Sequence, residues 1–164
     1  MTEPCPHGRP TPRARAAVVA ALAYAEAACT EAGESWTAQR RRVYELLLGS
    51  VQPVKAYELL TKLRVGAVAK PPTVYRVLDF LLAQGLAHRL ESEAAFVACT
   101  LHDDHDGTVG FLICDCCRRV EEVTLDESDV RDQAILRGFT IRRTVMEAHG
   151  RCPRCAAGDA VQPS

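Results

Sequence analysis

Two pairs of closely spaced cysteines constrain this chain more than any other feature. Cys114 and Cys117 are separated by two residues, and after 34 further residues Cys152 and Cys155 repeat that spacing. Two residues between thiolates let both sulfurs reach one ion at about 2.3 Å, and two such knuckles complete a tetrahedron around zinc. The pattern predicts a closed, structural zinc site, with disulfides or unligated thiols as the alternative. Cys116 offers another donor, but only Cys117 restores the two-residue gap.

A second group of metal-binding residue types lies near the middle of the chain. It comprises His88, Cys99, His102, Asp103, Asp104, His105 and Asp106. Imidazole together with thiolate favours zinc among the common divalent ions, and carboxylates can complete the shell. Each histidine taken alone is more typical of the protein surface. An ion bound where two lobes join would fix the angle between them, so its binding would act as a switch.

A weaker third group is formed by Glu122 and His149, which lie near the two knuckles. With Asp104 or Asp106 they could make an oxygen-rich site. A surface carboxylate and a solvated histidine are the equally simple alternative.

Composition narrows the class of protein. The chain has 164 residues, 48% of them hydrophobic, and contains no run of about 18 uncharged apolar residues, so we expect neither a membrane span nor a secretory signal. We therefore expect a cytoplasmic protein, in which paired cysteines more often hold metal than form disulfides.

Charge is distributed unevenly along the chain. Residues 1–90 carry 12 Lys and Arg against 7 Asp and Glu, whereas residues 91–164 carry 8 against 14. A basic half favours binding to a polyanion, and an acidic half favours binding to a cation. The alternative is that the uneven distribution of charge arose by chance.

Helical and strand patterns succeed one another in the first hundred residues. Residues 13–31, 37–48, 55–63 and 71–85 predict helices, the second capped by Thr37, and residues 86–90 and 95–99 predict two strands joined by a polar turn. Val18, Val19, Leu22 and Ala25 are expected on one face of the first helix, and Tyr57 among the apolar residues of the third. Three helices followed by a hairpin predict a winged helix-turn-helix whose last helix enters the major groove.

The remaining sequence predicts a small α+β unit with strands at 110–114, 120–125 and 139–148 and a helix at 127–137. A unit of about 55 residues is small for a stable monomer and would gain from a metal, from dimerisation or from both. The expected organisation is a disordered lead (1–12), a DNA-binding domain (13–99), a hinge (100–108), a zinc-bound dimerisation domain (109–157) and a tail (158–164).

These motifs together resemble the ferric uptake regulator (Fur) family, and within it the zinc-sensing, zinc uptake regulator branch. The resemblance covers about residues 37–155 and rests on AKPPTVYRVLDFLLAQGLAHRLES at 69–92, FLICDCC at 111–117 and EAHGRC at 147–152. It implies a homodimeric, zinc-activated repressor of zinc-uptake genes that binds an inverted-repeat operator.

The resemblance also assigns site residues. Tyr75 and Arg76 fall on base-contacting positions, the four knuckle cysteines on a structural zinc site, and His88 and Cys99 with a histidine of the following segment on a regulatory site. Glu122 matches a ligand position of some members.

The chain departs from the family pattern at two positions. Gly107 stands where members commonly carry a histidine, so we expect the remaining regulatory ligand to be His105, with His102 as second choice and Asp106 as a possible fourth ligand. Arg118 stands where a glycine usually follows the second knuckle cysteine, which could strain the turn.

The expected DNA contacts follow from chemistry. Arg76 can pair with guanine, and Tyr75 can contact a thymine methyl group or a phosphate. Further contacts are expected from Thr73, Lys70, Arg40, Arg41 and Arg42. Arg40, Arg41 and Arg42 lie at the start of a helix, where positive charge interacts unfavourably with the helix dipole unless an anion such as a DNA phosphate binds there. The alternative interpretation is that these arginines simply face solvent.

Three other functions are alternatives to that of a zinc-responsive regulator. A zinc hydrolase or deaminase would need an open metal position and a His-x-Glu motif, and the sequence contains no His-x-Glu, so we expect no enzyme. A thiol redox sensor would form reversible disulfides. An iron- or peroxide-sensing regulator is nearer, but Cys99 favours zinc because iron(II) and manganese prefer nitrogen and oxygen ligands.

Overall fold

The computed structural model describes residues 11–63, 71–100, 108–141 and 144–159. The chain forms two compact units, with the boundary between Thr100 and Leu101. We call them the N-terminal unit and the C-terminal unit and describe each by itself. Within the described residues, no helix is both long and apolar enough to cross a lipid bilayer.

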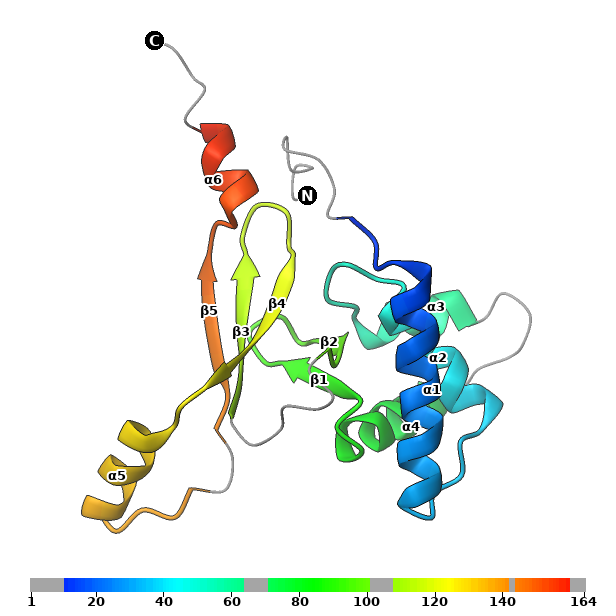
Figure 1. The fold of residues 1–164 in the computed structure, drawn as a ribbon, viewed down its shortest axis with the longest axis horizontal. Helices are drawn as coiled ribbons and strands as arrows, with labels where there is room; N and C mark the ends of the chain where they lie inside the picture. Colours follow the sequence, from blue (N-terminus) through cyan, green and yellow to red (C-terminus); the bar gives the residue numbers. More distant parts are fainter. Residues whose placement is uncertain (1–10, 64–70, 101–107, 142–143, 160–164) are drawn as a thin grey trace. The chain divides into compact units, whose positions relative to one another are not determined.

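Four helices and a hairpin build the N-terminal unit (Figure 1). The elements are α1 (Arg15–Glu31), α2 (Ala38–Leu48), α3 (Ala56–Leu63), α4 (Pro71–Ala83), β1 (Ala87–Leu90) and β2 (Ala95–Ala98). Strands β1 and β2 pair antiparallel, and Val54 forms an isolated bridge with Phe96. The predicted winged helix-turn-helix is thus confirmed, with α3 packed on α4 and the hairpin following directly.

Local signals set the ends of these helices. The Thr37 side chain accepts a hydrogen bond from the Arg40 N–H at 3.2 Å, which caps α2 as predicted. Gly85 adopts φ +66°, a left-handed conformation that glycine tolerates. The Gly85 and Leu86 N–H groups then donate to the carbonyls of Leu82 and Leu81, closing α4 with a Schellman motif.

One hydrophobic core joins the helices. Its fully buried members include Tyr44, Leu59, Val74, Leu78 and Leu81. Two residues predicted to face this core do not. Val19 is 60% exposed, because α1 packs through Leu22, Ala25 and Cys29, and Tyr57 is 62% exposed on the outer face of α3.

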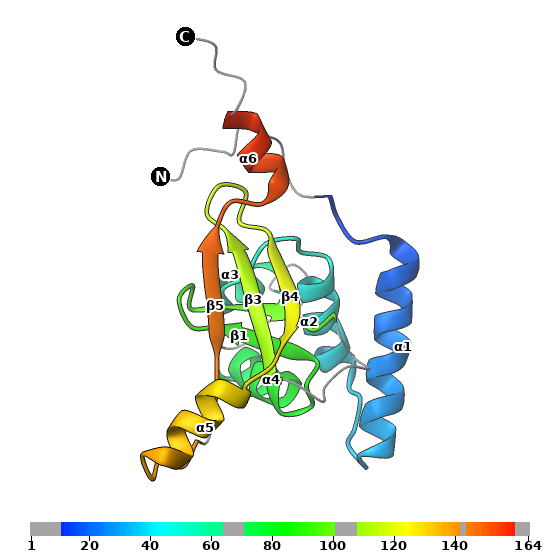
Figure 2. The ribbon, with the colours of Figure 1, turned by 60° about the vertical axis from the view of Figure 1, so that its left-hand side comes forward.

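The C-terminal unit is a three-stranded sheet with two helices. Its elements are β3 (Thr108–Cys114), β4 (Val120–Leu125), α5 (Ser128–Leu136), β5 (Met146–Gly150) and α6 (Pro153–Asp159). Figure 2 shows β3 between β4 and β5; β3 pairs antiparallel with β4 and parallel with β5. The overall α+β class is therefore confirmed.

Two details of this unit differ from the prediction. The expected strand 139–148 is limited to β5, because among the described residues of this stretch pairing is confined to Met146–Gly150, opposite residues 110–114 of β3. Phe139 lies outside the sheet and is 75% exposed. The short helix α6 was not predicted, because it begins within the second cysteine knuckle, includes Cys155 and has no apolar periodicity of its own.

Burial predicts the consequence of shortening one side chain in α4. We expect Val74→Ala to lower the free energy of unfolding of the N-terminal unit by about 2 kcal/mol, because Val74 is fully buried. Val19→Ala makes the same chemical change at an exposed helical site and should change it by less than about 0.5 kcal/mol. Denaturant unfolding followed by Trp36 fluorescence measures both, since Trp36 packs edge-on against Tyr44. Equal effects would contradict this account of the core.

Candidate metal centre and nucleic-acid interface

The two cysteine knuckles meet at one edge of the C-terminal sheet. Cys114 ends β3 and Cys117 lies in the turn that follows, while Cys152 and Cys155 follow β5. Because β3 and β5 are parallel neighbours, with Cys114 opposite Gly150, their carboxyl ends lie side by side. A separation of 34 residues in sequence thus becomes a single cluster.

The geometry of the cluster fits a zinc ion. The four sulfur atoms all lie within 4.8 Å of one another, and the Cys117 and Cys152 sulfurs are 3.8 Å apart. A tetrahedron with zinc–sulfur bonds of about 2.3 Å has edges of about 3.8 Å. Cys114, Cys117 and Cys155 are buried and Cys152 is partly buried, so four thiolates would close the coordination shell and leave no open position.

The backbone around Cys114 favours its thiolate. Burial raises the pKa of this thiol, but the backbone N–H groups of Cys152, Cys117 and Cys116, with the Cys117 side chain, lower it more, to about 6. The Cys152 N–H donates to the Cys114 sulfur at 3.3 Å. Burial has the larger effect at Cys117 and raises the pKa of that thiol. Thiolates are the form that binds zinc, so Cys114 is prepared as a ligand.

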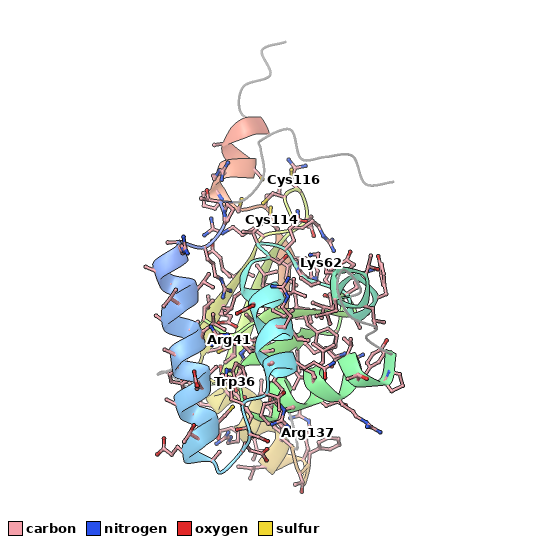
Figure 3. The ribbon with its side chains drawn as sticks, turned by 90° about the vertical axis from the view of Figure 1, so that its right-hand side faces the viewer. Trp36, Arg41, Lys62, Cys114, Cys116 and Arg137 are labelled. Carbon is pink, nitrogen blue, oxygen red and sulfur yellow. The ribbon has the colours of Figure 1, made fainter. Side chains whose placement is uncertain are left out.

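The extra cysteine and the unusual arginine lie in the same turn. Cys116 packs against the cluster but, among the described residues, does not join its group of ligand atoms. Figure 3 labels it beside Cys114. Arg118 adopts φ +61°, in the left-handed region that favours glycine. The strain expected from Arg118 is therefore present, and its N–H still closes the turn onto the Cys114 carbonyl at 2.8 Å.

The hairpin of the N-terminal unit brings His88 and Cys99 together. His88 lies opposite Val97, and Cys99 follows two residues later on the same face of the strand. Their ligand atoms lie within 4.8 Å of each other. Cys99 is fully buried and its N–H donates to the Leu86 carbonyl. The other residues predicted for this site, His102, Asp104, His105 and Asp106, lie outside the described residues.

The weaker third group does not form between its two described members. Glu122 lies on β4 opposite Phe111, and His149 lies on β5 opposite Ile113. Strand β3 and an offset of two residues along it separate them, which places their backbones about 12 Å apart. His149 instead lies with its Nδ1 atom 3.2 Å from Asp115 Oδ1.

The exposed face of α4 presents the residues predicted to contact bases. Val74, Val77, Leu78 and Leu81 fix the opposite face in the core, so Tyr75, 52% exposed, and Arg76 point outward and Thr73 is partly exposed. Lys70, predicted beside them, lies outside the described residues.

The arginines of α2 are engaged within the protein. The Arg40 guanidinium lies 3.3 Å from the centre of the Phe80 ring and pairs with Glu34, while Arg41 and Arg42 both pair with Glu45. Arg40 is thus held as a packing residue, and Arg41 and Arg42 remain largely exposed.

Sequence analysis missed one exposed aromatic residue. Tyr57 on α3, the helix before α4 in the helix-turn-helix, was assigned to the core, yet it shares an exposed face with Thr61. Its spacing from Leu60 and Leu63 fits a buried position, so periodicity alone could not have found it.

Comparison with known proteins decides the family. The ferric uptake regulator family model matches residues 31–149. The chain belongs to the ferric uptake regulator family. The zinc uptake regulation protein of Escherichia coli (strain K12) is 41% identical over 142 residues, which are 85% of this chain and 83% of that protein.

Solved structures agree with this membership. A zinc uptake regulator complexed with zinc and DNA is 40% identical, covers 87% of this chain and 97% of its own, and gives a TM-score of 0.83. The crystal structure of holo XcZur is 42% identical, covers 83% of this chain and 96% of its own, and gives a TM-score of 0.76. The resemblance to the ferric uptake regulator family predicted from sequence is confirmed. Members of this family are transcription regulators, so the enzyme alternative is excluded.

The geometry of the cluster predicts which cysteines this protein needs in order to bind zinc. Cys117→Ser should remove one zinc ion per chain and lower the melting temperature of the C-terminal unit, because it opens the four-sulfur shell. Cys116→Ser, one residue away, should leave both unchanged. Native mass spectrometry and thermal unfolding measure the two quantities. Zinc loss from Cys116→Ser but not from Cys117→Ser would show that the first knuckle is wrongly assigned.

Proposed function

We propose that this chain is a zinc-responsive transcriptional repressor, which binds inverted-repeat operators of zinc-uptake genes in the cytoplasm when zinc occupies a regulatory site. The observation that carries this proposal is the pairing of a histidine and a buried cysteine, His88 and Cys99, on the hairpin that follows the outward-facing helix α4. The likeness to a zinc uptake regulator complexed with zinc and DNA supports it.

Two kinds of zinc site serve different purposes. Zinc at Cys114, Cys117, Cys152 and Cys155 would hold the small C-terminal sheet together, because a closed thiolate shell supplies folding energy and no reactivity. Zinc at His88 and Cys99 would need further ligands, which we assign to His105 first and His102 second. Asp106 and Glu122 are candidates for a further position. Asp104 and His149 are the remaining candidates from the sequence, and within the described residues His149 does not join a group of ligand atoms.

The choice of zinc rests on donor chemistry. Cys99 supplies a sulfur donor beside the imidazole of His88, and that combination suits zinc better than iron(II) or manganese, which prefer nitrogen and oxygen ligands. An iron-responsive regulator of this family is the nearest alternative, and the DNA-binding experiment below separates the two.

A second copy of the chain is the proposed partner of the C-terminal unit. No residue of α5 is buried, and the described part of this unit exposes an apolar set that water does not favour. Its members are Leu112, Val130, Ile135, Leu136, Phe139, Val145 and Met146. A homodimer covers such surface, and two recognition helices held about 34 Å apart would enter successive major grooves of an inverted repeat.

The proposed domains follow these roles. Residues 13–99 bind DNA, 100–108 act as the hinge and 109–157 form the zinc-bound dimerisation domain, with a lead at 1–12 and a tail at 158–164. Zinc bound at the regulatory site would favour one angle between the two domains, and the metal-free dimer would visit that angle only part of the time.

A titration of operator binding against buffered free zinc tests the proposed switch. The parent should bind tightly only above a threshold of free zinc, whereas His88→Ala and Cys99→Ser should lose this dependence while keeping the zinc of the four-cysteine cluster. Cys29→Ser changes another buried cysteine of the same unit and should respond like the parent. Equally tight and selective binding by the metal-stripped parent, or activation by iron but not by zinc, would contradict the proposal.

Substitutions on α4 and α2 separate base recognition from backbone contact. Arg76→Ala should cost about 1–3 kcal/mol of operator affinity and relax the preference at one base pair, because it removes a base contact. Arg41→Ala should weaken binding to all sequences alike and reduce the salt dependence. Binding assays on operator variants at several salt concentrations measure both. An Arg76→Ala protein with unchanged affinity and preference would show that α4 does not read the sequence.

A further inference from the structure

The four-cysteine cluster depends on the alignment of two turns that belong to different strands. The first knuckle ends β3 and the second follows β5, so the sulfur tetrahedron exists only while these strand ends stay in register. Besides the contact between the Cys117 and Cys152 sulfurs, three contacts carry the argument. The Asp115 N–H donates to the Gly150 carbonyl at 2.8 Å, the Cys152 N–H donates to the Cys114 sulfur at 3.3 Å, and His149 Nδ1 lies 3.2 Å from Asp115 Oδ1.

These three contacts differ in what a substitution can remove. The first two are donated by backbone N–H groups and survive most side-chain changes. The third joins two side chains, and because an ionised carboxylate can only accept, the His149 ring is the donor. Asp115 lies inside the first knuckle and His149 lies three residues before Cys152, so this bond crosses from one knuckle loop to the other.

The position of His149 argues against a ligand role. The four sulfurs already complete a tetrahedral set, and the imidazole does not belong to that group of ligand atoms. Its Nδ1 atom is directed at Asp115 instead. The ring is 37% exposed and the Asp115 side chain 58% exposed, so the pair lies at the rim of the cluster.

We propose that His149 is a positioning residue, which through Asp115 holds the two knuckles in register and thereby slows the loss of zinc from the four cysteines. This inference rests on the structural zinc site of the proposed function and adds the residue pair that sets the lifetime of that site. Groups that orient metal ligands without touching the metal commonly change metal affinity by about 10- to 100-fold. An exposed pair contributes less than a buried one, so we expect an effect of about 3- to 10-fold.

Zinc transfer to a chromogenic chelator tests the proposal in the full-length chain. A background carrying His88→Ala and Cys99→Ser leaves the four-cysteine cluster as the site that is followed. In that background His149→Ala and Asp115→Ala should each release zinc about 3- to 10-fold faster, and the double variant no faster than either, because both remove one bond. His149→Asn, whose amide nitrogen can take the place of Nδ1, should restore much of the parent rate.

A matched control removes an equally exposed ion pair of the same unit. Arg119 and Glu121 lie 2.8 Å apart beside the first knuckle, and each side chain is 46% exposed. Glu121→Ala should leave the rate of zinc release unchanged. A similar acceleration in this control would mean that any loss of surface charge loosens the cluster, which would overturn the specific role of His149.

Cobalt substitution separates positioning from ligation. The absorption of Co(II) bound to four thiolates should be the same in His149→Ala as in its background, because no ligand is lost. A spectral change that shows loss of a nitrogen donor would make His149 a ligand and overturn the proposal, as would unchanged zinc release in both single variants. A background protein that holds no metal at the four cysteines would overturn the structural zinc site as well, so the two failures are distinguishable.

Discussion

The parallel pairing of β3 with β5 is the constraint on which the C-terminal unit depends. It places Cys114 opposite Gly150, so the turn after one strand meets the turn after the other and four sulfurs come within 4.8 Å. A slip of one residue in this register would turn every side chain of β5 to the opposite face and separate the knuckles. The cluster and the sheet therefore stabilise each other, which a unit with few buried side chains requires.

Much of this organisation could be predicted from sequence, because the informative residues obey short-range rules. The spacing of the cysteines is set by the reach of one turn around one ion, and the structure brings the four together. The buried face of α4 is set by apolar residues at helical intervals. Thr37 begins α2 through the hydrogen bond of its side chain, and Gly85 closes α4 because a residue without Cβ tolerates a positive φ.

The features that the sequence did not predict concern residues whose environment depends on parts of the chain that are distant in sequence. An apolar pattern over 139–148 predicts a strand, but a strand needs a neighbour, and in the described part of this segment Met146–Gly150 alone has one. Tyr57 has the spacing of a core residue but faces outward, because no helix or strand described in its unit covers that side of α3. The contact of His149 with Asp115 could likewise not be predicted from sequence, because only the pairing of β3 with β5 brings Nδ1 of His149 to the carboxylate.

The link between α4 and the hairpin is short and capped, which bears on how the two elements would move together. Gly85 closes α4, Leu86 is fully buried, and His88 follows within three residues, so a short link joins the helix that we propose contacts bases to the strand that carries a proposed metal ligand. Because this link is short, an ion bound at the strand would move α4 together with the strand and would not need to change the helix itself. The preference for a base sequence and the preference for a metal would then depend on different residues, one set on the helix and one on the strand. Substitutions could therefore change one preference without changing the other.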